Sequence, residues 1–128
     1  AIFRNKKNGK FFLYDWKRVK NIYTNPNFFY NYGYYPIDNI PNLNGYHYFL
    51  QLNFYKMILK EYNIEIENMF ICQLHPLLNN YKLTEFKNLS PYILKILTYL
   101  KETNYKLKQK EREEKFELDF SVFFKNIF

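Results

Sequence analysis

The chain has 128 residues, which suits one domain. Its 19 Lys and Arg against 12 Asp and Glu give a net charge of +7, which favours an anionic partner. The single cysteine excludes an internal disulfide framework and a cysteine-rich metal site built from this chain alone. No apolar run approaches the roughly 20 residues of a membrane helix and the first residues form no secretory signal, so we expect no membrane association and an intracellular location, in the cytoplasm or nucleus.

The first 18 residues predict a β-hairpin. Residues 1–4 are a short apolar segment, and residues 5–9 form a turn cluster in which Gly9 supplies a positive φ. Residues 10–17 are again of β type, and their nearly continuous apolar character is typical of a strand covered on both faces. We therefore expect two paired strands, the second of them inside the core.

Residues 19–44 show no sustained periodicity and predict a long loop. Prolines at positions 26, 36 and 41 interrupt the segment, and connections longer than about 15 residues are usually functional or mobile. The loop is rich in Tyr and Phe, which either stack on unpaired bases or simply reflect AT-rich codons. Asn44 is expected to cap the helix that follows.

A helix and a strand are predicted next. Apolar residues at helical spacing indicate a helix over residues 46–62, and Leu50, Leu52, Phe54 and Ile58 are expected to hold it in the core. Residues 65–74 are typical of a strand, which ends before a proline.

The last third of the chain predicts a second helix, which begins at Ser90 with a proline in its first turn. Residues 106–115 are charged with mixed signs and predict a solvated helical extension, and residues 116–128 predict either a strand or a docking segment. The element order indicates an α/β domain with a mixed sheet. We expect one domain over residues 1–128, with a long loop at 19–44 and a charged extension and tail at 106–128.

The predicted strand 10–17 ends in Asp15, Trp16 and Lys17. Alternate strand residues share a face, so Asp15 and Lys17 lie together, and Trp16 with Tyr14 is expected to anchor the opposite face in the core. A carboxylate here can hold a hard cation such as Mg²⁺, and an ammonium can position water or neutralise charge on a phosphorane. The alternative for this tripeptide alone is a surface ion pair at a strand end.

A second polar pair lies on the predicted helix. Gln51 and Tyr55 are four residues apart and share one helix face, and His47 lies one turn earlier on the same line. Taken alone, Gln and Tyr at this spacing more often form only the polar edge of a helix. Elsewhere, His75 either ends its strand structurally or contacts metal or DNA, and Cys72 is expected to be a buried thiol.

In this order, residues 11–18 (FFLYDWKR), 48–55 (YFLQLNFY) and 69–76 (MFICQLHP) resemble the RecB-like branch of the PD-(D/E)XK nuclease superfamily. Members of that branch, including uncharacterised ones of large DNA viruses, have Asp/Glu-x-Lys on a strand, then a helix with Gln-x-x-x-Tyr, then another strand. The resemblance covers residues 1–76. It implies a restriction-endonuclease-like core with a mixed central sheet flanked by helices, and a metal-dependent DNA nuclease that hydrolyses phosphodiesters with Mg²⁺ or Mn²⁺.

Carried over by position, the resemblance implies a role for each matching residue. Asp15 is a metal ligand, with the Trp16 backbone carbonyl as a second ligand, and Lys17 is the catalytic lysine. Gln51 and Tyr55 orient the site or touch the substrate phosphate.

Two cations follow the strand motif directly. Arg18 and Lys20 are expected to contact DNA phosphates together with Tyr55. The alternative for both is that they are solvated surface cations.

The chain departs from the family at one point. The family has an earlier acidic ligand on the strand before that of Asp15, but residues 1–14 hold no Asp or Glu. We therefore expect a nuclease domain that is incomplete at its N-terminus, with that acid just before Ala1, and weak or no cleavage by these 128 residues. Asp38 of the loop is the alternative source of a carboxylate.

The rival hypothesis is a degenerate, inactive copy of the nuclease. It leads to a non-catalytic nucleic-acid-binding or assembly module on the same fold, which would bind DNA with strong salt dependence and no metal effect. A third hypothesis is a protein-interaction domain, which predicts no DNA binding at moderate salt.

Overall fold

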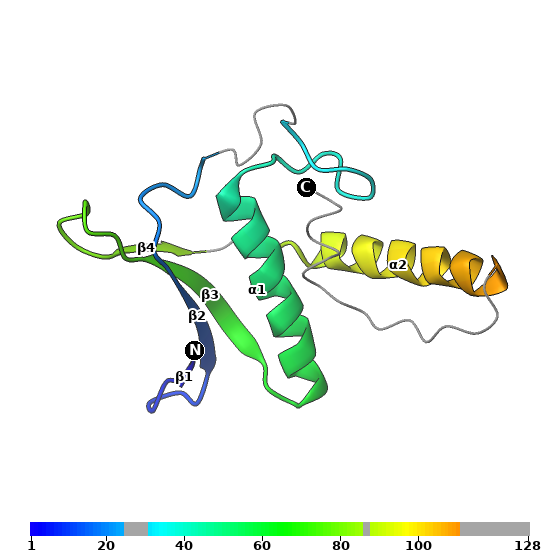
Figure 1. The fold of residues 1–128 in the computed structure, drawn as a ribbon. Coiled ribbons are helices and arrows are strands. Elements are labelled where there is room, and N and C mark those ends of the chain that lie inside the picture. The colour runs from blue at the N-terminus through cyan, green and yellow to red at the C-terminus, as the bar shows by residue number, and fades with distance from the viewer. Residues whose placement is uncertain (25–30, 86–87, 111–128) are drawn as a thin grey trace.

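The computed structural model describes residues 1–24, 31–85 and 88–110, with side chains as far as residue 104. The elements are β1 (Ile2–Arg4), β2 (Phe11–Lys17), α1 (Asn44–Glu61), β3 (Ile66–Gln73), β4 (Lys82–Glu85) and α2 (Ser90–Lys110) (Figure 1). Within these ranges, neither helix is both long and apolar enough to cross a membrane.

The strands form one mixed sheet in the order β1-β2-β3-β4. β1 and β2 are the antiparallel hairpin predicted for residues 1–18, and Gly9 in its turn has a φ of 73°. β2 and β3 run parallel and are connected through α1, whereas β4 pairs antiparallel with β3. The expected mixed α/β class is therefore confirmed. β4 was not predicted, because its four residues are mostly exposed at a sheet edge and show no apolar alternation.

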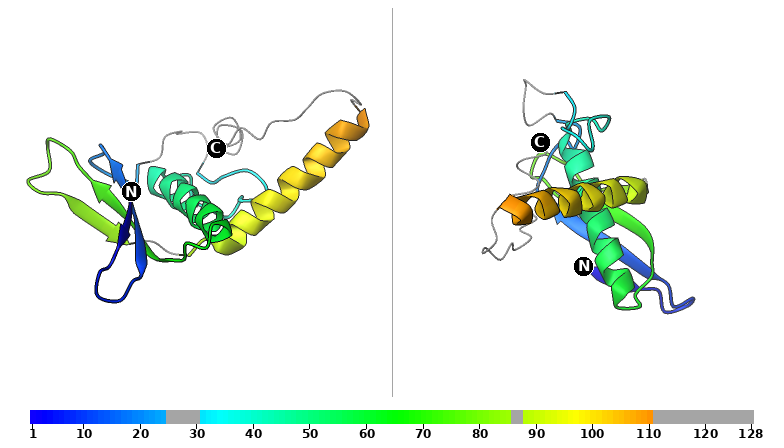
Figure 2. Two further views of the ribbon diagram at one scale, coloured as in Figure 1. Left: turned by 90° about the horizontal axis from the view of Figure 1, so that it is seen from below. Right: turned by 90° about the vertical axis from the view of Figure 1, so that its right-hand side faces the viewer.

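The core lies on one side of the sheet. α1 packs against β2 and β3 and also against α2, so that the sheet, α1 and α2 form successive layers (Figure 2). Leu50, Leu52 and Phe54 of α1 are buried as predicted, together with Ile71 of β3 and Ile96 of α2. Because α1 is enclosed on two sides, only a narrow edge of it remains for polar residues.

Three predictions about the core are wrong. Trp16 is 47 % exposed and Tyr14 is only partly buried, because both lie on the sheet face opposite α1. No element of the described residues packs on that face, so β2 is covered on one side and not on both. Ile58 is 38 % exposed, because it continues the outward edge of α1 that carries Gln51 and Tyr55.

The connection between β2 and α1 packs on the core where it is described. Ile22, Ile37 and Ile40 are buried there. The cap predicted for Asn44 is wrong, because Leu43 is the N-cap and has no side-chain capping bond. The backbone N–H groups of the first two helical residues donate instead to loop carbonyls, which replaces a side-chain cap.

α2 begins at Ser90 as predicted, and residues 106–110 are helical, within the segment 106–115 for which an extension was predicted. The rest of that extension and the predicted strand or docking segment at 116–128 lie outside the described residues, as do residues 25–30 and 86–87.

Candidate active site

Asp15 and Lys17 lie on the face of β2 that packs against α1. Side chains alternate along a strand, so both share the face of Leu13, which is buried in the core. Lys17 Nζ lies 3.0 Å from Asp15 Oδ2, and the two side chains are only 22 % and 23 % exposed. They form a partly buried ion pair and not the solvated surface pair considered as the alternative.

The predicted residues of α1 join this pair. Lys17 Nζ donates to Gln51 Oε1 at 3.2 Å across a sequence separation of 34, and Gln51 Nε2 donates to the Tyr55 hydroxyl at 2.9 Å. The ring of Tyr48, whose role the sequence analysis missed, lies with its centroid 4.6 Å from Lys17 Nζ. The structure therefore brings Asp15, Lys17, Gln51 and Tyr55 into one connected network.

The network holds the Lys17 ammonium from three sides. The Asp15 carboxylate, the Gln51 amide oxygen and the Tyr48 ring each attract its positive charge. Because Gln51 uses its oxygen on Lys17 and its nitrogen on Tyr55, both partners determine the orientation of its amide. The Tyr55 hydroxyl accepts from Gln51, and its own O–H remains as a donor on a side chain that is exposed.

The Asp15 carboxylate already attracts one cation, the Lys17 ammonium. Its Oδ2 atom is buried, and the contact with Lys17 lacks hydrogen-bond geometry, so this oxygen accepts no hydrogen bond from the described residues. Carboxylate oxygens are the hard ligands that Mg²⁺ and Mn²⁺ prefer, and a cation at Oδ2 would have to displace the Lys17 ammonium, which lies 3.0 Å from this atom.

The direction of the Trp16 carbonyl follows from its neighbours on β2. Carbonyls alternate in direction along a strand: that of Lys17 accepts from Leu74 on the β3 side, whereas Tyr14 exchanges hydrogen bonds with Ala1 on the β1 side. The Trp16 carbonyl therefore points to the β1 side, one step beyond those bonds.

The described part of the chain contains no group of three His, Cys, Asp or Glu that could hold a metal ion. Asp15 is the carboxylate of the network, and Asp38, the alternative acid, is exposed on the loop. One carboxylate and one carbonyl are fewer ligands than tight binding of a divalent cation requires.

His47 does not join the network, although it lies one turn before Gln51. Its Nε2 is 2.9 Å from Asn42 Oδ1, and because an amide oxygen only accepts, Nε2 carries the proton. Burial lowers the pKa of His47 from 6.5 to about 4, so its ring is neutral at physiological pH. His47 thus ties the first turn of α1 to the preceding loop.

Gln73 of β3 is a further residue that the sequence analysis missed. It pairs in register with Lys17 across the parallel strands and is 1 % exposed. Its Nε2 donates to the carbonyls of Val19 at 3.4 Å and Lys20 at 3.2 Å, so it holds the segment that leaves β2. The sequence did contain a signal, since Gln73 lies two residues after the buried Ile71 and shares its face.

A groove of about 610 Å³, which we call the end groove, adjoins the carboxyl ends of β2 and β3. Lys17 and Arg18 line it, whereas the exposed side chain of Lys20 does not. His75 also lines it, and its Nδ1 accepts the N–H of Leu77 at 3.1 Å, which is the structural role considered for it at the strand end.

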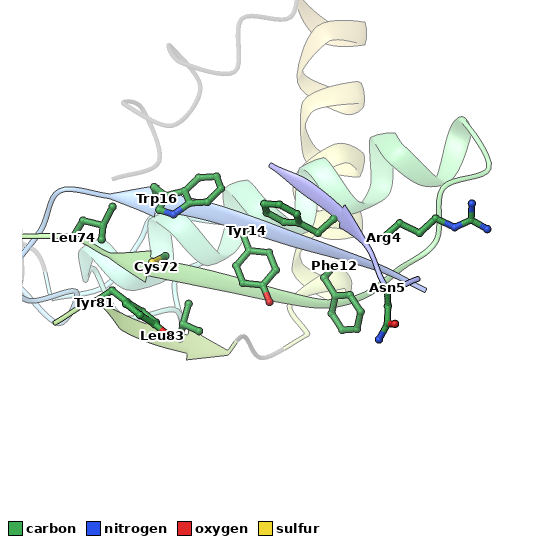
Figure 3. A pocket seen from close by; sticks show the side chains of 10 residues that line it. Arg4, Asn5, Phe12, Tyr14, Trp16, Cys72, Leu74, Tyr81 and Leu83 are labelled. Atoms are coloured by element: carbon green, nitrogen blue, oxygen red, sulfur yellow. The ribbon is translucent and has the colours of Figure 1, made fainter. Parts of the chain in front are cut away.

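A second groove of about 730 Å³, the face groove, covers the sheet face opposite α1 (Figure 3). It is lined mainly by apolar side chains of β1, β2, β3 and β4, including Phe3, Tyr14, Trp16 and Leu83. Its Cys72 is buried, as predicted.

No protein-family model matches the chain, and neither the curated proteins nor the solved structures give a significant match.

Proposed function

We propose that this chain carries active-site residues of a metal-dependent DNA nuclease of the RecB-like PD-(D/E)XK type. The observation that carries the proposal is the 3.2 Å hydrogen bond from Lys17 Nζ to Gln51 Oε1, which joins the strand motif to the helix motif. The order β2-α1-β3, with parallel strands and both motifs at the carboxyl end of β2, supports the same assignment.

The proposed reaction is hydrolysis of a phosphodiester. A water oxygen adds to phosphorus, one P–O ester bond breaks, and the leaving oxygen takes up a proton. Lys17 would position the water or neutralise the charge that builds on the phosphorane oxygens. Gln51 holds the Lys17 ammonium in place, and the Tyr55 O–H donates to a phosphate oxygen.

The Asp15 carboxylate and the Trp16 carbonyl are the groups that would hold Mg²⁺ or Mn²⁺. When bound, the cation acts as a Lewis acid toward the phosphate. With one carboxylate, we expect weak metal binding and slow cleavage by the 128-residue chain.

Cleavage by an excess of the chain tests the proposal. End-labelled DNA is incubated with Mn²⁺ or Mg²⁺, and we expect slow hydrolysis that EDTA, Asp15→Asn and Lys17→Ala each abolish. Lys60→Ala, an exposed cation in the last turn of α1, is the matched control and should cut like the wild type. A Lys17→Ala variant that cuts at the wild-type rate would refute the role of Lys17.

The second candidate is a non-catalytic nucleic-acid-binding or assembly module on the same fold. It is favoured by the single carboxylate in the network and by the lack of a three-ligand group among the described residues. DNA that stays intact in Mn²⁺, but is bound with a steep salt dependence that no metal alters, would support this candidate.

A further inference from the structure

We propose that the end groove binds unpaired bases of single-stranded DNA, with Trp16 and Tyr81 as stacking platforms and Arg18 and His75 as phosphate contacts. This inference rests on the proposed function and names its substrate class. It uses side chains outside the catalytic network, of which Trp16, Tyr81 and Arg18 are exposed and His75 is partly buried.

The two aromatic rings are exposed and lie on the same face of the sheet. Trp16 is 47 % and Tyr81 58 % exposed, and both line the end groove and the face groove (Figure 3). Trp16 pairs in register with Cys72, which pairs with Leu83, and Tyr81 lies two residues before Leu83. The Trp16 and Tyr81 positions are therefore about two strand spacings apart across the sheet and two residues apart along it, roughly 12 Å in all. That separation leaves room for successive bases of one strand.

The groove's charge suits a phosphate backbone. Lys17, Arg18 and His75 line it, and no acidic residue is found in its lining within the described part of the chain. Because His75 Nδ1 accepts the Leu77 N–H, the ring proton is on Nε2, which is left as a donor for a phosphate oxygen. Cations beside exposed aromatic rings are the arrangement that binds single strands.

The position of Lys17 links this groove to the proposed chemistry. Lys17 lines the end groove and also donates to Gln51 in the network. A strand held at Arg18 therefore lies next to the residues that would hydrolyse it. In a duplex the bases are stacked on each other and cannot cover Trp16 or Tyr81, so the rings favour single-stranded over duplex DNA.

Trp16 is the only tryptophan of the chain, which makes its fluorescence a direct probe. In EDTA, without cleavage, a short oligothymidylate should quench it saturably, with the same Kd that fluorescence anisotropy of the labelled oligonucleotide gives. A blunt hairpin duplex should bind more weakly and quench little. A duplex that binds and quenches as strongly as the single strand would overturn the inference.

Variants separate stacking from charge. Trp16→Leu and Tyr81→Leu should each weaken oligothymidylate binding by about fivefold to a hundredfold, and Trp16→Phe should retain most of the affinity. Arg18→Gln should weaken binding and lower the salt slope by about 0.7. Tyr62→Leu, at the opposite end of α1 and 74 % exposed, and Lys60→Gln are the matched controls and should bind like the wild type.

Circular dichroism establishes whether each variant folds. If Trp16→Leu does not fold, Tyr81→Leu still tests the inference. If folded Trp16→Leu or Tyr81→Leu binds oligothymidylate as tightly as Tyr62→Leu does, the inference is overturned. That result is expected if the grooves bind a protein and not DNA. Because this assay needs no metal, intact binding without any cleavage would count against the proposed function alone.

Discussion

His47 makes the stability of this domain depend on pH in a defined window. Its pKa is lowered by burial from 6.5 to about 4, so between these values the folded chain keeps the ring neutral while the unfolded chain binds a proton. The unfolded state then binds more protons, and the free energy of unfolding rises with pH. Stability from this group is full above pH 6.5 and is lost as the pH falls toward 4.

The size of the effect follows from the shift. At 1.36 kcal/mol per pKa unit, a shift from 6.5 to about 4 corresponds to an upper limit of about 3 kcal/mol. The His47 ring is only partly buried, and water screens part of the penalty, so we expect a loss of about 1–2 kcal/mol.

Urea denaturation at a series of pH values from 7.5 to 4 measures this loss. Carboxylates also titrate at the low end, and the difference between wild type and His47→Gln removes their contribution, because the substitution takes away only the imidazole. We expect the wild type to lose about 1–2 kcal/mol more than His47→Gln across the window. Parallel pH curves for the two proteins would refute the account of His47.

Three further substitutions test the structure around the site. Asn53→Ala should lower the free energy of unfolding, measured in urea, by about 2–3 kcal/mol, because buried Asn53 links α1 to the start of α2. Its side chain donates to the Phe49 carbonyl at 2.9 Å and accepts from the Leu89 N–H at 3.1 Å, and a cost near zero would contradict these bonds. Gly33→Ala should cost about 1–3 kcal/mol, because a Cβ there would lie 2.9 Å from Ile37 atoms, and a wild-type Tm would argue against that close approach. Gln51→Leu should slow metal-dependent cleavage by about tenfold to a hundredfold without unfolding the chain, since it releases the Lys17 ammonium; unchanged cleavage would show that Gln51 does not position Lys17.

The part of the site that could be predicted follows local rules. Alternation along a strand places Asp15 and Lys17 on one face, and helical spacing places Gln51 and Tyr55 on one edge. These rules need no knowledge of the tertiary fold. The contact between the two pairs is tertiary, and it was expected only through the resemblance to a family.

The wrong and missing predictions concern features that depend on tertiary packing and not on the local sequence. One face of β2 carries Phe11 and Leu13 and the other carries Phe12, Tyr14 and Trp16, so the sequence does not show which face α1 covers. Trp16 was therefore assigned to the core although it lies on the exposed face. Gln73 and Tyr48 gain their roles only from the pairing of β2 with β3 and from the seating of α1. The capping bonds of α1 come from loop carbonyls, which no local capping motif signals.

Binding of Mn²⁺ at Asp15 can be measured even if the chain does not cleave DNA. In an NMR titration of the isotope-labelled chain, paramagnetic Mn²⁺ broadens the amide signals of residues close to it. If Asp15 is a metal ligand, we expect broadening centred on residues 14–18 and on Gln51, which Asp15→Asn removes and Lys60→Ala retains. Broadening centred elsewhere, or unchanged in Asp15→Asn, would contradict the assignment of Asp15, Lys17, Gln51 and Tyr55 as a metal-dependent nuclease site.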